Sequence, residues 1–271
     1  MAEISAKDVM ALRNMTGLSM MACKAALAEA GGDLEKAQDI LRKQLKGKMD
    51  TKTDRAAGEG RIAIARSREA ATMVELRAET DFTAKNEMFI QATQKCADLA
   101  LAAHAGDVPA TAEITALIDQ LRISTGENIS FARGHKLLQD PSSGGFGTYV
   151  HHDGKTGVLV QAEGSVNEDV LKDVCMHITA ATPRPMGVTI NDIPADLAEK
   201  ERRFRVEQAM ESGKPQQIAE KMVEGAMRKF FEERALLEQP FVRDESKKIK
   251  DLLGPKATIV AFYRWQVGVA D

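Results

Sequence analysis

One pattern of apolar residues occurs twice along this chain, and it limits the possible folds more than any other feature. Each copy has two short segments of alternating apolar residues, a turn between them, and a longer segment with helical periodicity. The predicted strands and helix are 61–66, 72–78 and about 83–104 in the first copy, and 148–152, 157–163 and about 167–181 in the second. Each copy is followed by one further strand, 129–138 or 257–267, and a helix over 112–124 accompanies the first copy. We therefore predict an α+β fold with a duplicated core of antiparallel sheets.

The first fifty residues predict a separate module of three short helices. Ser5 and Ser19 precede the first two helices as N-cap residues, and Asp33 opens the third. Gly31 stops the second helix, and Gly47 marks the expected end of the third. Each helix carries one apolar stripe, so the module is predicted to bury a small core of its own.

A segment within the second copy, residues 193–231, interrupts the repeated pattern. It is helical on both sides of Gly213-Lys214-Pro215, which divides it into two arms. Few apolar residues lie along the arms, which favours a helical hairpin, a short coiled coil, that projects into solvent over a helix pair packed flat on the body. The predicted domains are a three-helix module at 1–50, a linker at 51–60, core subdomain N at 61–140, core subdomain C at 141–192 and 232–271, and the inserted hairpin at 193–231.

Charge and cysteine content argue against several classes of function. The 271 residues include 37 Lys and Arg and 40 Asp and Glu, so a net charge of −3 gives no overall attraction to nucleic acid or anionic lipid. The sequence shows neither a basic and apolar leader nor eighteen consecutive apolar residues. Cys23, Cys96 and Cys175 are far apart and form no CxxC pair. We expect a cytoplasmic protein with reduced thiols that crosses no membrane and binds no nucleic acid directly.

The motifs that would indicate an enzyme are weak. His151 and His152 are adjacent on a predicted strand, so their side chains point to opposite faces and are not expected to share a metal ion. The segment 153–156 lacks the first glycine and the following helix of a phosphate-binding loop, and is predicted to be a hairpin turn. The glycine-rich segment 142–147 is predicted to be a linker between the core subdomains. We expect no catalytic centre, no metal site and no cofactor.

The segment 79–86 lies where a predicted strand ends and a predicted helix begins. If Thr83 is the N-cap of that helix, the usual local packing partner of Phe82 is the residue at position 87. That residue is Glu87, so Phe82 lacks an apolar partner. Two interpretations are open from the residues alone: the ring seals the sheet against the helix, or it is exposed for binding.

Four segments of the chain resemble the elongation factor Ts family. The sequence ETDFTAKNEMF, residues 79–89, is similar to that family's signature, and residues 12–27 resemble its N-terminal motif. Residues 213–225 resemble the hairpin of its projecting arm, and residues 238–242 resemble a segment near its C-terminus. The matches occur in the same order over about residues 4 to 268, which makes the resemblance highly specific.

The resemblance implies a guanine-nucleotide exchange factor for elongation factor Tu, the GTPase that carries aminoacyl-tRNA to the ribosome. Such a factor binds the GDP-bound and nucleotide-free GTPase and has no catalytic centre of its own. The three N-terminal helices resemble the family's ubiquitin-associated (UBA) type module, which docks on the GTPase domain. The positions that match partner contacts are Thr80, Asp81, Phe82 and Thr83, which are implied to dislodge Mg²⁺, together with Leu12, Arg13, Met20, Met21, Lys24, His177 and Val242.

Some residues depart from the family pattern, and other classes of function stay open. The departures are Ala22, Arg77, Ala78, Thr83 and Arg243. One alternative is a UBA-like protein-interaction adaptor without exchange activity, in which residues 1–50 bind alone. Another is RNA binding by the basic stretch 42–61, which would show a steep dependence on salt.

Overall fold

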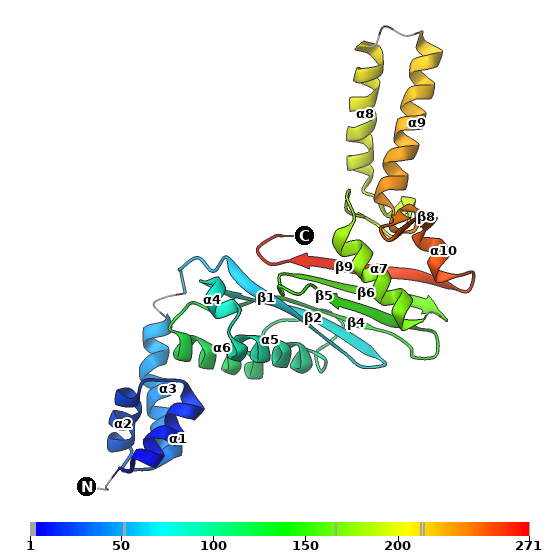
Figure 1. Ribbon diagram of the computed structural model, residues 1–271. Coiled ribbons are helices and arrows are strands. Elements are labelled where there is room, and N and C mark those ends of the chain that lie inside the picture. Colours follow the sequence, from blue (N-terminus) through cyan, green and yellow to red (C-terminus); the bar gives the residue numbers. More distant parts are fainter. Residues whose placement is uncertain (1–3, 51–52, 166, 212, 214, 271) are drawn as a thin grey trace. The chain divides into compact units, whose positions relative to one another are not determined.

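The structure, a computed structural model, describes residues 4–50, 53–165, 167–211, 213 and 215–270, with the backbone alone for residues 45–50. The chain divides into two compact units (Figure 1). Unit 1 comprises Met1–Leu138, His152–Thr156 and Trp265–Asp271, and unit 2 comprises Gln139–His151 and Gly157–Arg264. Both units contain helices and antiparallel strands, which confirms the predicted α+β class. The finer division into five domains stays a prediction.

Three helices form the first part of unit 1: α1 (Ala6–Thr16), α2 (Met20–Glu29) and α3 (Leu34–Asp50). The hydroxyls of Ser5 and Ser19 each accept a hydrogen bond from a backbone amide of the first turn, so both predicted N-caps are confirmed. The apolar stripes meet in a small core made of Val9, Leu12, Cys23, Ala26, Leu27, Ala37 and Leu41. Helix α3 continues past Gly47, so its predicted end is wrong by about a turn. Residues 51–52 of the predicted linker lie outside the described residues.

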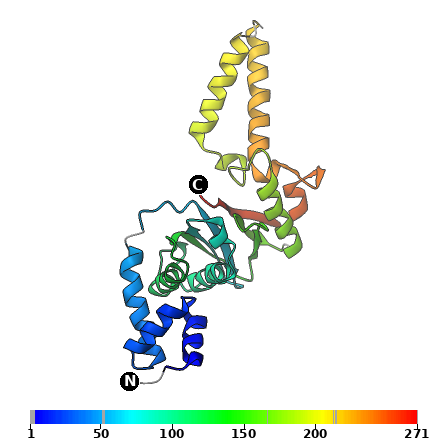
Figure 2. The same ribbon diagram turned by 60° about the vertical axis from the view of Figure 1, so that its left-hand side comes forward.

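Unit 1 also contains a four-stranded antiparallel sheet in the order β1-β2-β4-β3. Its strands are β1 (Glu59–Arg66), β2 (Ala70–Ala78), β3 (Gly106–Asp107) and β4 (Ser130–Leu138). Helices α5 (Glu87–Ala100) and α6 (Ala112–Thr125) cover one face of the sheet (Figure 1, Figure 2), and the one-turn helix α4 (Asp81–Ala84) joins β2 to α5. The first predicted copy is confirmed, except that the helix expected from Thr83 is two helices.

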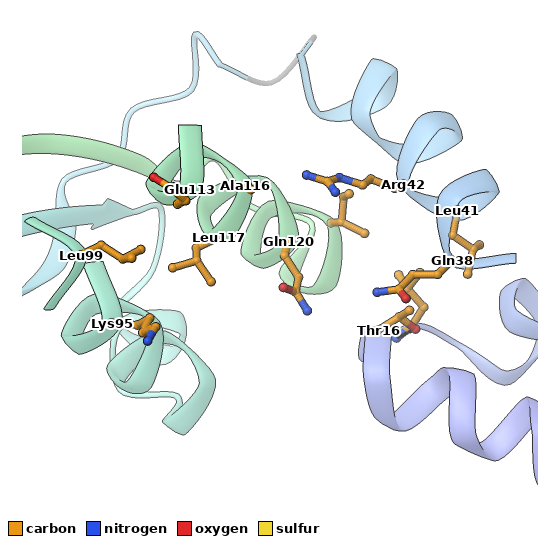
Figure 3. A pocket seen from close by; sticks show the side chains of 12 residues that line it. Thr16, Gln38, Leu41, Arg42, Lys95, Leu99, Glu113, Ala116, Leu117 and Gln120 are labelled. Carbon is orange, nitrogen blue, oxygen red and sulfur yellow. Dashed lines mark hydrogen bonds between the residues drawn. The ribbon is translucent and has the colours of Figure 1, made fainter. Parts of the chain in front are cut away.

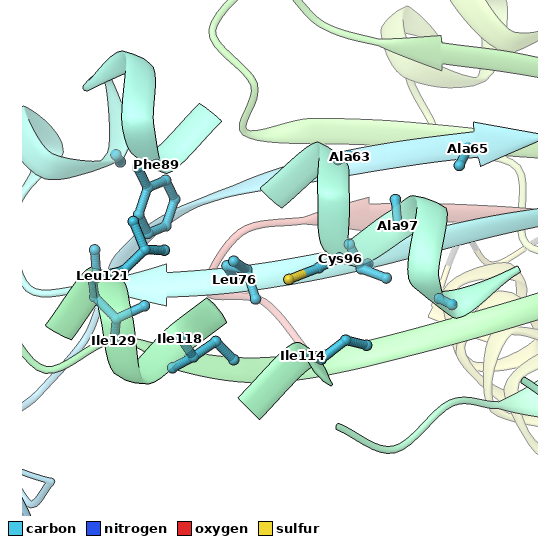
Figure 4. Packing of buried hydrophobic residues seen from close by; sticks show 14 of the residues in the cluster. Ala63, Ala65, Leu76, Phe89, Cys96, Ala97, Ile114, Ile118, Leu121 and Ile129 are labelled. Carbon is cyan, nitrogen blue, oxygen red and sulfur yellow. The ribbon is translucent and has the colours of Figure 1, made fainter. Parts of the chain in front are cut away.

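A second core of unit 1 lies between the sheet and helices α5 and α6 (Figure 4). Alternate residues of β2 share one face of the strand, so Val74, Leu76 and Ala78 all point into this core. Helices α5 and α6 supply Phe89, Cys96, Ile114, Ile118 and Leu121. Burial raises the pKa of the Cys96 thiol to about 12, so this thiol stays protonated and unreactive at neutral pH.

The other row of β2 residues carries a buried charge. The carboxylate of Glu75 is fully buried and accepts hydrogen bonds from Arg77 Nε and, at 2.7 Å, from Arg133 Nε. Arg133 also donates to the Val269 carbonyl at 2.9 Å, and its guanidinium lies 4.4 Å from the centroid of the Trp265 ring. A buried carboxylate needs such partners because its desolvation is costly. Arg77, a departure from the family pattern, is therefore a counter-charge for Glu75.

Unit 2 has the same order of elements as the first copy. Strands β5 (Gly144–Val150) and β6 (Thr156–Gly164) form a hairpin, helix α7 (Glu168–Ala180) follows, and β9 (Ala257–Gln266) pairs with β6. The predicted linker at 142–147 is wrong, because most of it is strand β5. A Cβ at Gly147 would lie 2.9 Å from Leu171 Cβ and 3.0 Å from Cys175 Sγ. The glycine therefore serves close packing of α7 on the strand rather than chain flexibility.

The inserted segment of unit 2 forms the predicted helical hairpin. Helices α8 (Ala195–Glu211) and α9 (Gln216–Arg234) run side by side and extend away from the sheet of this unit (Figure 1, Figure 2). Their seam and base bury Ala209, Val223, Met227 and Phe230, whereas Phe204 and Met210 are exposed. Lys214 of the predicted break lies outside the described residues. The unpredicted elements around the hairpin are η1 (Ile190–Asp192), η2 (Leu236–Glu238), β7 (Pro240–Phe241), β8 (Asp244–Lys248) and α10 (Ile249–Leu253).

Replacing Glu75 with glutamine tests the buried charge of β2. The variant keeps the shape of the side chain but leaves Arg77 and Arg133 without their shared counter-charge. Removing one partner of a buried ion pair costs about 3–5 kcal/mol, and these two arginines are partly exposed, so we expect the free energy of unfolding to fall by about 2–4 kcal/mol. Urea denaturation monitored by circular dichroism measures this free energy of unfolding. The control Glu69→Gln, in the exposed β1–β2 turn, should change stability by less than about 0.5 kcal/mol; equal stability of the two variants would contradict the prediction.

Candidate functional site

The segment 79–86, called here the elbow, connects β2 to α5 through the single turn of α4. Thr80 has extended backbone angles and its hydroxyl accepts a hydrogen bond from Thr83 N at 3.3 Å, so Thr80 is the N-cap of α4. Asn86 then caps α5 by accepting from Met88 N at 2.9 Å. Thr83, considered as the N-cap from the sequence, therefore caps neither helix. The chain turns twice within a few residues, and Phe82 lies between the two caps.

The side chain of Phe82 points outward. It is 84% exposed, whereas the neighbouring Thr83 and Ala84 are buried against the rest of unit 1. Successive residues of a helix are about 100° apart, so a single turn can bury some side chains and present another. The interpretation in which the ring seals its own sheet is thus excluded, and the ring is free to pack against another molecule.

Asp81 places a negative charge beside the exposed ring. Its carboxylate is 2.6 Å from Lys85 Nζ, one turn further along the chain. The hydrogen bond and the charge of Lys85, with a further contribution from Lys155, hold the pKa of Asp81 below its usual value. Asp81 is therefore ionised at neutral pH, and it stabilises the N-terminus of α4.

Both threonines of the elbow are held by a residue that the sequence analysis did not identify. Glu127 follows α6, and its Oε1 atom accepts hydrogen bonds from Thr80 Oγ1 at 2.6 Å and from Thr83 Oγ1 at 2.7 Å. Gly126, with a φ of 73° in the left-handed region, is the C-cap that ends this helix just before Glu127. The sequence does show a carboxylate, Glu127, directly after the C-cap glycine. This local pattern does not indicate which residues the carboxylate contacts.

His177 and Val242 meet in unit 2. The His177 ring is 1% exposed, with Nε2 located 2.9 Å from Gln239 Oε1 and Nδ1 located 3.3 Å from Val242 N. The Gln239 amide nitrogen already donates to the carbonyls of Pro183 and Glu233, so its oxygen must accept from His177. His177 Nδ1 therefore accepts from the Val242 amide, which leaves the ring neutral.

The two side chains differ in their exposure. Val242 is exposed, whereas the His177 ring lies inside unit 2 and reaches the surface only through the backbone that it holds. Gln239 orients the ring and was not identified from the sequence. A direct contact of His177 with a partner stays a prediction, and the geometry favours an indirect one.

The predicted contact residues of the N-terminal helices also fall into two groups. Arg13, Met20, Met21 and Lys24 are exposed, with Met21 at 77%, whereas Leu12 is completely buried in the core of the three helices. Exposed methionines are unbranched and polarisable, so they adapt to an apolar partner surface. Leu12 supports the helices on which the exposed residues lie.

A cavity of about 410 Å³ in unit 1 lies between α3 on one side and α5 and α6 on the other (Figure 3). Leu41, Leu99 and Leu117 form apolar parts of its wall, and no predicted site residue lines it. Within the described residues, no group of three or more His, Cys, Asp or Glu is placed to hold a metal ion. No helix of the described chain is long and apolar enough to cross a membrane.

Substitution of His177 tests its neutral, buried state. Burial holds the pKa of His177 below its ordinary value, although the hydrogen bond with Gln239 opposes this. As pH falls through about 6.5, the unfolded chain gains a proton at this residue before the folded chain does, so the free energy of unfolding decreases. We expect His177→Gln to lose less stability than the wild type between pH 7.5 and 5.5 in urea denaturation. Parallel losses in the two proteins would show that His177 is not responsible.

Comparison with known proteins identifies relatives over almost the whole chain. Residues 79–269 match the family described as Elongation factor TS. A protein named Elongation factor Ts from Actinobacillus succinogenes (strain ATCC 55618 / DSM 22257 / CCUG 43843 / 130Z) is 42% identical over 270 residues, which cover 99% of this chain and 92% of the relative. Its namesake from Thioalkalivibrio sulfidiphilus (strain HL-EbGR7) is 39% identical over 275 residues, covering 98% and 92%. With the signature segment folded into an exposed elbow, these similarities show that the chain belongs to the elongation factor Ts family.

Proposed function

We propose that this chain binds elongation factor Tu in its GDP-bound and nucleotide-free forms and releases GDP by pressing Phe82 into the nucleotide site. Membership of the elongation factor Ts family implies nucleotide exchange on elongation factor Tu during translation elongation. The proposal concerns how the exchange is achieved. The observation that carries it is the Phe82 side chain, which is 84% exposed on a capped turn that follows a buried strand.

The mechanism follows from linkage between the two ligands of the GTPase. Suppose that the factor binds the nucleotide-free GTPase more tightly than the GDP-bound form. Bound GDP then lowers the affinity of the GTPase for the factor, and the bound factor lowers its affinity for GDP by the same ratio. GDP is held through its phosphates and its Mg²⁺ ion, so a segment that displaces the groups around the ion weakens both. The ring of Phe82 ligates no metal and acts as a wedge.

The charge of Asp81 complements the wedge. Its carboxylate lies next to Phe82 and is ionised at neutral pH, because Lys85 lowers its pKa. A negative charge brought towards bound phosphates in a site of low dielectric raises the energy of the nucleotide complex. Phe82 and Asp81 would thus act together, the first by displacing side chains and the second by repulsion.

The free energies show that the wedge is insufficient by itself. A release that is faster by about 10⁴-fold requires a barrier lower by roughly 5.5 kcal/mol. Burial of one phenylalanine side chain contributes about 1.5–3 kcal/mol. The remainder is assigned to loss of the Mg²⁺ contacts and to other surfaces: Met20, Met21 and their neighbours on the N-terminal helices, and Val242 in unit 2.

The adaptor alternative explains less of the chain. It accounts for the three N-terminal helices alone, whereas the relatives align over 98–99% of this sequence. It also leaves Phe82 exposed without a role.

Truncation of Phe82 tests the proposal. At a saturating concentration of the Phe82→Ala variant, release of a fluorescent GDP analogue from elongation factor Tu should be slower than with wild type by about 10-fold or more, because 1.5–3 kcal/mol of interface burial is lost. Thermal unfolding should stay unchanged, since the ring packs on little of its own chain.

The matched control is Phe204→Ala, which removes another exposed phenylalanine, on α8. It should leave the maximal rate of GDP release close to that of the wild type. Wild-type rates with Phe82→Ala, or equal losses with both variants, would reject Phe82 as the wedge.

A further inference from the structure

The carboxylate of Glu127 accepts hydrogen bonds from residues that precede and follow Phe82 in the chain. Besides the hydroxyls of Thr80 and Thr83 on its Oε1 atom, Glu127 accepts hydrogen bonds at 3.2 Å from the backbone amides of Glu79 and Thr80 on its Oε2 atom. An ionised carboxylate has about four acceptor positions, so these donors use its capacity fully. Asp81 and Phe82 are the two residues enclosed between the bonded threonines.

Two of the hydrogen bonds to Glu127, those from the threonine hydroxyls, are short. The hydroxyl contacts of 2.6 and 2.7 Å have the short length expected when a hydroxyl donates to a charged carboxylate. Thr80 Oγ1 also accepts from Thr83 N, so the same hydroxyl caps α4 and anchors it. The donors come from both backbone and side chains, which fixes the path of the chain as well as its side-chain rotamers.

The connection between α6 and β4 also donates a hydrogen bond to the elbow, in addition to accepting hydrogen bonds from it. The amide of Asn128 donates to Glu79 Oε1 at 2.7 Å. The Asn128 side-chain amide donates to the carbonyls of Thr53 at 2.9 Å and Arg55 at 2.7 Å. Glu127 and Asn128 together connect the elbow and the segment leading into β1 through hydrogen bonds.

Local structure alone does not hold Phe82 in place. Helix α4 is one turn long, and a single turn is unstable without tertiary contacts. The exposed ring adds no packing energy of its own. A side chain that must enter a partner in one orientation binds more tightly when that orientation exists beforehand.

We propose that Glu127 is a positioning residue that presents Phe82 to the GTPase. It acts through Thr80 and Thr83. The inference rests on the proposed function of Phe82, and it adds a residue from a distant part of the sequence to that function. Loss of the carboxylate should loosen the elbow and slow nucleotide release, while the core of unit 1 stays intact because Glu127 is not part of it.

A double-mutant cycle with the full chain tests this inference. GDP release from elongation factor Tu is measured at saturating factor for the wild type, Glu127→Gln, Phe82→Ala and the double variant. Glutamine keeps the size of the side chain but loses the charge and turns one acceptor into a donor. We expect Glu127→Gln to slow release about 5-fold or more with Phe82 present, and less than about 2-fold with Phe82→Ala, because residues that act as one unit are non-additive.

The control is Glu113→Gln, which removes an exposed carboxylate at the other end of α6 and should leave the rate near that of the wild type. Equal losses from Glu127→Gln in both Phe82 backgrounds would overturn the inference, because they would show that Glu127 acts independently of the ring. A wild-type rate with Glu127→Gln would overturn it as well.

Amide hydrogen exchange of the free chain gives a readout that does not depend on the GTPase. In Glu127→Gln the amides of Glu79 and Thr80 should exchange about 10-fold faster or more, while those of β2 keep wild-type rates. Unchanged exchange at both amides would reject the positioning role. If Phe82→Ala leaves GDP release unchanged, the proposed wedge fails, and this measurement alone decides whether Glu127 holds the elbow.

Discussion

Burial of β2 on both of its faces is the constraint on which unit 1 depends. One row of its side chains packs against α5 and α6, and the other holds Glu75 among its arginines. A shift of the strand by one residue would move the apolar row to the charged side and Glu75 into the apolar core, so the register is strongly determined. The elbow begins directly after this strand. The position of Phe82 is therefore set by a packed core, although the ring itself lies outside it.

The two candidate contact regions follow the same physical scheme. In unit 1 a carboxylate, Glu127, binds the backbone and hydroxyls around an exposed phenylalanine. In unit 2 a buried imidazole, His177, accepts a hydrogen bond from the amide of the exposed Val242. An exposed apolar side chain has little packing energy with its own chain to fix its orientation. Polar groups therefore have to fix the backbone that carries it. Both polar groups contact parts of the chain that are far away in sequence.

Several parts of the fold could be predicted because their signals are local. Alternation located the hairpins, and the serine N-caps located the N-terminal helices, since both depend on neighbouring residues. The segment around Gly147 was misjudged because glycine has the same signature in a flexible loop and at a close approach of two elements. Its neighbours Leu171 and Cys175, which decide between these cases, lie on a helix that follows the next strand. The start of α4 was missed because Thr80 and Thr83 are both good cap residues.

The sequence by itself determined the duplication, the order of its main strands and helices, and the apolar faces of these elements. Each of these depends on residues within a few positions of one another, where helix and strand geometry relates spacing to direction. Only the tertiary structure decided that Phe82 is exposed and that Leu12 and His177 are buried. It also revealed Glu127, which is 47 residues from Thr80, and Gln239, which is 62 residues from His177. Such pairs meet because the whole chain folds around its cores, and no local pattern encodes that meeting.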